Sequence, residues 1–242
     1  MSGYVRQKEI LELLGKKSAV SVAELCETLY ASAPTIRRDL QFLEKEGLIR
    51  RTHGGATLLR GAAAESPFTI RSGENGSAKE QLAAEAEALI SDGMTLFLDS
   101  SSTVLHLARR LGRFRELTVI TNGIRTAEVL SDFPHLTVFS TGGRVRPHSK
   151  SFIGTAACDF IRAHRADYCF FSSQGVSEEN GATEANEEEA LLKRAYLAGS
   201  RKAVLLFDES KWGKEYCARI CYLTELSAVF RRGEGINPGR GA

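Results

Sequence analysis

The sequence predicts an α/β protein in which a small N-terminal winged helix-turn-helix is joined to a larger domain built on a parallel sheet. Three helical patterns and a glycine-centred hairpin occupy the first 58 residues. From residue 77 onward helix and strand patterns alternate, and the stretch between is rich in Gly, Ala, Ser and Glu. We therefore expect domains at residues 1–58 and 77–232, a linker at 59–76 and a flexible tail at 233–242.

Composition and charge restrict the class of protein. The chain is 43% hydrophobic and 26% charged, and it contains no apolar run that would span a bilayer, so no membrane partner is expected. Residues 1–10 lack the apolar core of a secretory signal, which favours a cytoplasmic protein. The five cysteines are scattered without a CxxC pair, so we expect neither a metal nor a cofactor. The net charge is only +2, but residues 1–60 carry ten basic and seven acidic side chains, which favours a polyanionic partner there.

The first two helices are predicted from an apolar face and a cap. Residues 4–14 place Ile10 and Leu14 on one side of an amphipathic helix. Ser21 and Glu24 have the spacing of a capping box, in which the hydroxyl and the carboxylate each accept a hydrogen bond from a backbone amide. A second helix is therefore expected to begin after Ser21.

A third helix is predicted at residues 33–46, capped by Ser32 and closed by Gly47. Pro34 is tolerated in its first turn because no amide hydrogen bond is needed there. The apolar residues fall on one face: Ile36, Leu40 and Leu43. The opposite face carries Pro34, Arg37, Arg38, Gln41 and Lys45. Asp39 does not favour DNA electrostatically, so we expect it to hold an arginine or a neighbouring helix in place.

Residues 48–58 predict a hairpin that forms a wing around Gly54 and Gly55. The order helix, capped helix, basic helix, basic hairpin is what entry into the major groove of DNA requires. The alternative is a small helical bundle whose basic face is only solvated. The candidate DNA-binding residues are Ser32, Pro34, Thr35, Arg37, Arg38, Gln41, Lys45, Arg50, Arg51 and His53.

The larger domain alternates apolar strands with helices, which predicts a parallel sheet covered by helices. Strands are expected at residues 94–98, 117–121, 136–140, 168–172 and 202–207. Helices are expected at residues 79–90, 103–111, 123–131, 152–163 and 185–199. In such sheets ligands bind beyond the carboxyl ends of the strands.

Polar residues and glycines follow each predicted strand. They are Asp99, Ser100, Ser101, Ser102 and Thr103, then Thr121 and Asn122, then Gly142 and Gly143, then Gly175, and finally Lys211, with Lys150 bordering the same region. Each has an ordinary explanation as a helix cap, a turn or a surface ion pair. Their convergence at one edge of the sheet favours a pocket for a small anionic molecule.

The segment Ser32–Leu40, together with Arg51–Ala56, resembles the signature of the DeoR family of bacterial repressors, although Ala31 stands where the family commonly has Val. The larger domain resembles the DeoR-type effector domain, which is similar in fold to ribose-phosphate isomerase and glucosamine-phosphate isomerase. The resemblance implies a repressor of a sugar or carbon-metabolism operon. Its expected partners are double-stranded operator DNA, a phosphorylated sugar effector and further copies of the chain in a homodimer or homotetramer.

The resemblance also implies roles for individual residues. Ser100 to Thr103 and Lys211 would hold the phosphate, and Asp99, Asn122, Gly142, Gly143 and Gly175 would shape the pocket. Glu184 would lie at the sugar end, with Thr183, Glu189 and Lys193. An isomerase needs an acid directly after the fourth strand, where this sequence has residues 172–177 without one, so we expect no catalytic residue. An isomerase-like enzyme with an appended DNA-binding module is the alternative.

Overall fold

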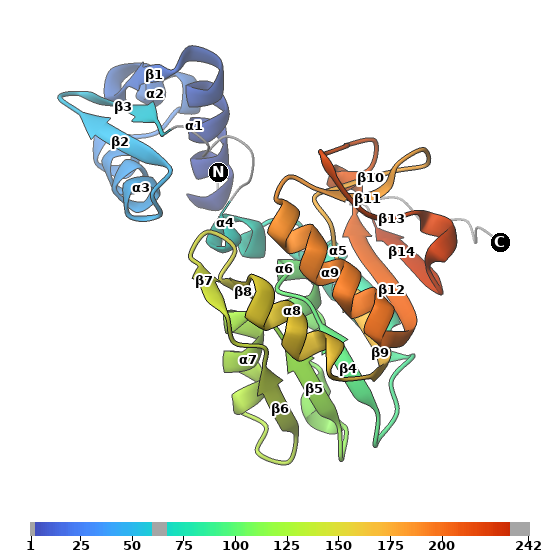
Figure 1. The fold of residues 1–242 in the computed structure, drawn as a ribbon. Coiled ribbons are helices and arrows are strands. Elements are labelled where there is room, and N and C mark those ends of the chain that lie inside the picture. Colours follow the sequence, from blue (N-terminus) through green and yellow to red (C-terminus); the bar gives the residue numbers. More distant parts are fainter. Residues whose placement is uncertain (1–2, 60–66, 233–242) are drawn as a thin grey trace. The chain divides into compact units, whose positions relative to one another are not determined.

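The computed structural model describes residues 3–59 and 67–232 and divides the chain into two compact units, Met1–Glu74 and Asn75–Ala242 (Figure 1). The predicted tail at 233–242 and residues 60–66 of the predicted linker lie outside the described residues. Within the described ranges, no helix combines the length and the apolar character needed to cross a membrane.

The N-terminal unit has the predicted winged helix-turn-helix. Its helices are α1 (Gly3–Lys17), α2 (Val22–Leu29), α3 (Ala33–Lys45) and α4 (Phe68–Gly73), and its strands are β1 (Ala19–Ser21), β2 (Ile49–Thr52) and β3 (Gly55–Leu58). The predicted hairpin is the antiparallel pair β2 and β3, and β1 adds a third strand that was not predicted. The turn of the hairpin needs Gly54, whose φ of 108° is unfavourable for residues with a side chain.

Apolar residues of all four helices form the core of this unit. Ile10, Leu14, Leu25 and Ile36 are 0% exposed, and Ile70 of α4 is 0% exposed in the same cluster. The second half of the stretch predicted as a linker is therefore a folded part of the N-terminal unit. Ile70 packs in the apolar core of that unit, which composition alone did not indicate.

The two predicted helix caps differ from the expected pattern. The Ser21 hydroxyl accepts a hydrogen bond from Glu24 N at 3.1 Å, as predicted, but the Glu24 carboxylate binds the Lys17 ammonium instead of returning to a backbone amide. That ammonium lowers the pKa of Glu24. Ser32 occupies the capping position of α3, yet its hydroxyl bonds the Thr35 hydroxyl at 2.9 Å.

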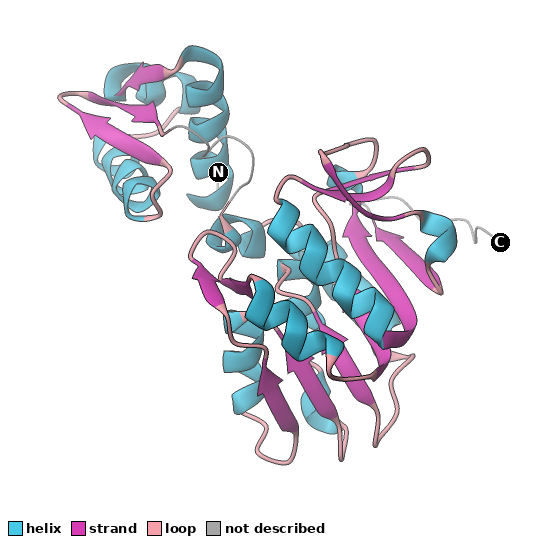
Figure 2. Cartoon of the chain, viewed as in Figure 1, coloured by secondary structure: helices cyan, strands magenta, loops and turns pink. Residues whose placement is uncertain are grey.

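A six-stranded sheet forms the centre of the C-terminal unit (Figure 2). In the order β14, β12, β9, β4, β5, β6 the strands are Ala228–Arg232, Ser200–Asp208, Ala166–Phe171, Thr95–Leu98, Thr118–Thr121 and Thr137–Ser140. Every neighbouring pair is parallel, so the carboxyl ends of all six strands lie at one edge. We call this edge the carboxyl edge.

Helices cover both faces of the sheet, because its strands alternate apolar side chains between the two sides. The helices are α5 (Gly76–Glu87), α6 (Ser102–Ala108), α7 (Ile124–Ser131), α8 (Thr155–Arg162) and α9 (Glu187–Gly199). In β4, Leu96 and Leu98 belong to the cluster under α5, α6 and α7, whereas Phe97 belongs to the cluster under α8 and α9. The predicted parallel α/β fold is therefore confirmed.

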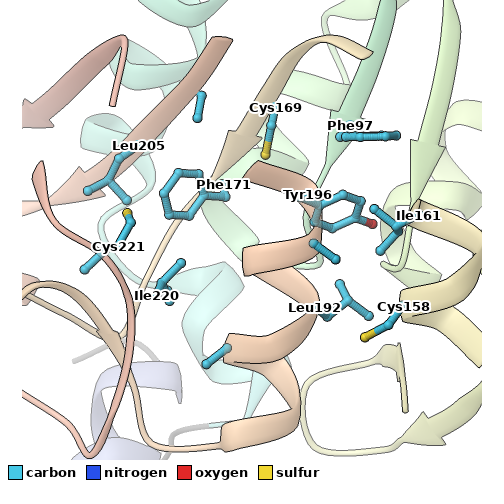
Figure 3. Close-up of a cluster of buried hydrophobic side chains, with 14 of the residues drawn as sticks. Phe97, Cys158, Ile161, Cys169, Phe171, Leu192, Tyr196, Leu205, Ile220 and Cys221 are labelled. Atoms are coloured by element: carbon cyan, nitrogen blue, oxygen red, sulfur yellow. The ribbon is translucent and has the colours of Figure 1, made fainter. Parts of the chain in front are cut away.

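The cluster under α8 and α9 includes three of the five cysteines (Figure 3). Phe97 and Tyr196 pack with ring centroids 5.1 Å apart. Burial raises the pKa of the Cys158 and Cys169 thiols, and it raises the pKa of Cys221 to about 12. These thiols are consequently neutral packing groups.

Short antiparallel strands are the elements that the sequence pattern missed. They are β7 (Arg144–Arg146) with β8 (Ser151–Ile153), and β10 (Gly175–Ser177), β11 (Gly181–Glu184) and β13 (Ala218–Cys221), together with the parallel edge strand β14. The helix predicted at 152–163 begins only at Thr155, because residues 151–153 pair with β7 and Gly154 has a φ of 94°.

Candidate DNA-binding and effector sites

Helix α3 separates an apolar face from a polar one, as its sequence predicts. Ile36, Leu40 and Leu43 are at most 1% exposed. The side chains on the opposite face are exposed and, among the described residues, make no hydrogen bond or ion pair: Arg37, Arg38, Gln41 and Lys45. These three cations and one side-chain amide are available to an external partner.

Asp39 anchors this helix to α1. Its carboxylate accepts hydrogen bonds from Arg6 Nε, from Arg6 Nη2 at 3.3 Å and from Gln7 Nε2 at 3.0 Å. The expectation that Asp39 holds an arginine and a neighbouring helix is confirmed. Because Asp39 is 4% exposed and compensated internally, its charge weakens the positive face of α3 little.

The remaining candidate DNA-binding residues lie at the start of α3 and on the wing. Ser32 and Pro34 are exposed, and Arg50 and His53 are exposed on β2 and in the turn that follows it. Arg51 differs, because its amide donates to Glu44 Oε1 at 3.0 Å and its guanidinium lies 3.8 Å from Glu44 Oε2. Arg51 therefore connects the wing to α3.

Asp99 joins the ends of two strands at the carboxyl edge. It is 0% exposed and follows β4 directly. Oδ1 accepts from Ser101 N at 2.9 Å, and Oδ2 accepts from Ser172 N, just beyond β9, at 3.0 Å. Ser100, Ser102 and Thr103, which come next, are all at most 6% exposed. Asp99 thus fixes the loop that carries these hydroxyls.

Lys193 brings a third segment to the same place. Its ammonium, buried at 5% residue exposure, donates to Glu184 Oε1 and to Ser172 O at 2.7 Å and lies 3.4 Å from Asp99 Oδ2. Burial by itself lowers the pKa of Lys193, but the carboxylates of Glu184 and Asp99 outweigh it and raise that pKa above its ordinary value. The lysine is therefore protonated and links α9 to the ends of β4, β9 and β11.

Asn122 is fixed from two sides at the end of β5. Tyr196 OH donates to Asn122 Oδ1 at 3.2 Å, and Asn122 Nδ2 donates to Phe152 O at 3.2 Å. Burial raises the pKa of Tyr196 well above its ordinary value, which keeps the donor proton on the phenol. Thr121 Oγ1 accepts from Gly123 N at 3.0 Å, and Lys150 O accepts from Ile124 N at 2.9 Å.

The predicted glycines are needed for the backbone conformation and for close backbone packing. Gly142 and Gly143 have φ values of 64° and 110°, and a Cβ on Gly143 would stand 2.7 Å from Ile153 O. A Cβ on Gly175 would collide with the carbonyl of Lys214.

Lys211 ends the short 3-10 helix Glu209–Lys211, which follows β12 at the carboxyl edge. Asp99 accepts a hydrogen bond from Ser101 N and forms an ion pair with Lys193, which in turn donates to Glu184. Gly142 and Gly143 instead lie beyond the outer strand β6.

Several polar residues at this edge were missed. Ser149 and Ser151 both donate to Glu189 Oε1, at 2.8 and 2.6 Å. Their spacing of two places them on one side of an extended segment, a signal that was present in the sequence. Thr126 is 1% exposed, and its hydroxyl has no hydrogen-bond partner among the described residues. A Cβ on Gly123 would stand 2.8 Å from that hydroxyl.

A winged unit with an exposed basic third helix, followed by a separate parallel α/β unit with a polar carboxyl edge, defines a two-domain DNA-binding regulator. Residues 6–61 match the DeoR-like helix-turn-helix domain, and residues 74–231 match the DeoR C terminal sensor domain. The chain belongs to the DeoR family of helix-turn-helix transcriptional regulators.

Curated relatives cover most of the chain. The HTH-type transcriptional regulator GolR of Listeria innocua is 40% identical over 213 residues, which is 88% of this chain and 84% of the relative. The transcriptional repressor CsqR of Escherichia coli is 32% identical over 233 residues, covering 95% and 88%. The glycerol-3-phosphate regulon repressor of the same organism is 31% identical over 225 residues, covering 93% and 89%. All three are regulators, and this chain is a regulator rather than an isomerase-like enzyme.

Ribose 5-phosphate isomerases are among the solved structures that match part of the chain. Ribose 5-phosphate isomerase A of Methanocaldococcus jannaschii has a TM-score of 0.43 and 18% identity, covering 57% of this chain and 55% of that one.

Proposed function

We propose that this chain represses an operon of sugar or carbon metabolism and that a phosphorylated sugar bound at the carboxyl edge changes its affinity for operator DNA. The observation that carries the DNA-binding half is the exposed face of α3. There Arg37, Arg38, Gln41 and Lys45 have no partner among the described residues, while the opposite face is buried. Such a helix presents donors to base edges and phosphates at once.

The side chains of α3 suit two kinds of DNA contact. A guanidinium binds guanine O6 and N7 bidentately or neutralises a phosphate, and both Arg37 and Arg38 have the chemistry for either. Gln41 suits the N6 and N7 edge of adenine. Arg50 and His53 of the wing would contact the backbone, and Lys45 would contact phosphate near the end of the helix.

Support for the effector half comes from the chemistry of the carboxyl edge. Hydroxyls of Ser100, Ser102 and Thr103 and the ammonium of Lys211 suit the oxygens of a phosphate. The carboxylates of Asp99 and Glu184 suit sugar hydroxyls, which are donors. A relative whose name refers to glycerol-3-phosphate adds support for a phosphorylated ligand.

A dimer or tetramer would give the chain two DNA-reading units. Helix-turn-helix proteins gain affinity by placing two recognition helices on half-sites about 10 base pairs apart, centre to centre. We therefore expect sedimentation to show an even number of copies and the selected DNA site to be a palindrome.

Replacement of Arg38 tests the DNA contacts. If Arg38 neutralises a phosphate, Arg38→Ala lowers the slope of log affinity against log salt by about 1. If it reads a base, discrimination at one base pair falls by about 1–3 kcal/mol. Arg115→Ala, at an exposed arginine of the C-terminal unit, is the control and should leave both quantities unchanged. An Arg38 variant that resembles this control contradicts the assignment.

Thermal shift of the full chain tests the effector site. Ribose 5-phosphate, sn-glycerol 3-phosphate and inorganic phosphate serve as probes, because a ligand that binds only the folded chain stabilises it by about 2.7 kcal/mol at one hundred times its Kd. Thr103→Val removes a hydroxyl while keeping the shape of the side chain, and it should weaken the shift. A wild-type chain whose melting point responds to no probe contradicts the effector half.

A further inference from the structure

Asn75 connects an element of one unit to an element of the other. On its N-terminal side, α4 is part of the first unit, with Ile70 fully buried and Glu74 Oε1 at 3.6 Å from Lys8 Nζ. On its C-terminal side, α5 begins at Gly76 and buries Ala83 in the second unit. Glu74 and Asn75 thus lie between two helices that are each packed into a different core.

The backbone of Asn75 is in the left-handed region, with φ 52° and ψ 37°. Asparagine tolerates this region better than most residues with a side chain, and glycine adopts it freely. Because φ and ψ are the only soft backbone torsions, a change at this residue reorients α4 with respect to α5. Asn75 has the position and the conformation of a hinge.

The side chain of Asn75 reaches the carboxyl edge. Its Nδ2 donates to Asp208 Oδ1 at 2.8 Å, and Asp208, the last residue of β12, is 3% exposed. The same oxygen accepts from Ser210 N at 3.0 Å and from the Ser210 hydroxyl. One carboxylate oxygen therefore joins Asn75 to the short helix that ends in Lys211.

We propose that the hydrogen bond between Asn75 and Asp208 transmits occupancy of the effector site to the DNA-binding unit. The inference rests on the proposed function, in which Lys211 holds the phosphate of the effector. A phosphate that draws Lys211 toward it moves the short helix and the carboxylate that caps it. The movement changes the bond that holds Asn75 in its left-handed conformation. An effector shifts an equilibrium between two conformations only by binding one of them more tightly. In this inference the two conformations differ in the hydrogen bond between Asn75 and Asp208.

The test measures DNA affinity of the full chain with and without ribose 5-phosphate, sn-glycerol 3-phosphate or inorganic phosphate. The DNA is a duplex that the wild-type chain selects from a random-sequence library. In the wild type we expect the probe with the largest thermal shift to change DNA affinity by roughly 5–150-fold. Asn75→Gly removes the amide but keeps the backbone conformation accessible, and it should reduce this change to about twofold or less. DNA affinity without probe and the thermal shift by the probe should be retained.

Two further variants separate the hydrogen bond from the fold. Asn75→Asp places a second carboxylate against Asp208 and should also abolish the effect of the probe. Combining Asn75→Asp with Asp208→Asn restores one donor and one acceptor and should restore the effect. Ser77→Ala, at an exposed neighbour whose side chain makes no hydrogen bond among the described residues, should behave as the wild type.

Three results would overturn the inference, and they are distinguishable. If Asn75→Gly binds the probe and keeps the full change in DNA affinity, the hydrogen bond does not transmit occupancy. If the wild type binds a probe that leaves its DNA affinity unchanged, there is no coupling to transmit. If no probe shifts the wild-type melting point, the proposed effector site fails and the inference fails with it.

Discussion

Replacing Lys193 with methionine should strongly destabilise the C-terminal unit. The side chain keeps most of its volume but loses the ammonium that lies against Glu184 and 3.4 Å from Asp99 Oδ2. At an effective dielectric constant of about 20, the contact with Asp99 alone corresponds to about 5 kcal/mol of Coulomb attraction. Removing one partner of a buried ion pair typically costs about 3–5 kcal/mol, because the remaining charge is left without compensation. We expect a loss of that size, or roughly 6–20 °C in melting temperature.

The single tryptophan makes this loss measurable. Trp212 stacks on Phe207 with ring centroids 6.1 Å apart, so its fluorescence in urea reports unfolding of the C-terminal unit. Protonation removes the uncompensated carboxylate charge, so the difference between variant and wild type should shrink as the pH falls. Lys214→Met makes the same chemical change at an exposed lysine and should alter stability by less than about 0.5 kcal/mol. A Lys193 variant with the wild-type midpoint, or with a deficit independent of pH, would refute the reasoning.

Three further changes have expected outcomes. Burial, followed by the positive charges of neighbouring side chains, lowers the pKa of His106. The folded chain therefore loses stability as the pH falls below about 6.5. In urea titrations between about pH 5 and 7.5, His106→Gln should make the free energy of unfolding depend less on pH. Gly123→Ala would place a Cβ 3.0 Å from the Ser100 Cα, so it should reduce the thermal shift by ribose 5-phosphate while circular dichroism stays unchanged; an unaltered shift would contradict this. Asp39→Ala removes the buried carboxylate that accepts hydrogen bonds from Arg6 and Gln7 and should destabilise the N-terminal unit by about 3 kcal/mol, seen by circular dichroism but not by tryptophan fluorescence.

The N-terminal unit was predictable in most of its detail because helix periodicity and caps are local properties. The buried positions Ile36, Leu40 and Leu43 follow from their spacing alone, and the role of Asp39 followed from its negative charge, which does not favour contact with DNA. The packing of α4 could not be predicted from the sequence, since the core residues that it packs against lie on helices far away in the sequence. The capping box failed in its second half because Lys17 competes for the Glu24 carboxylate.

In the C-terminal unit the parallel sheet and its carboxyl edge were predictable, but the pairing of charges there was not. Alternating apolar segments indicate strand order only coarsely, yet parallel strands always bring their ends together. The contact of Asn75 with Asp208 joins residues 133 positions apart, and no local pattern signals such a pair. Strands of three residues, such as β10, are too short to show alternation. The DNA and effector roles of the candidate residues stay predictions.

The burial of Ile70 has a practical consequence for dissecting the molecule. A fragment that stops at residue 58, where the wing ends, would leave an apolar cavity in the helical core and should be less stable than one that continues to Glu74. Chimaeras that exchange ligand specificity between relatives should accordingly be joined at Asn75, so that each parental half retains the contacts with which it folds.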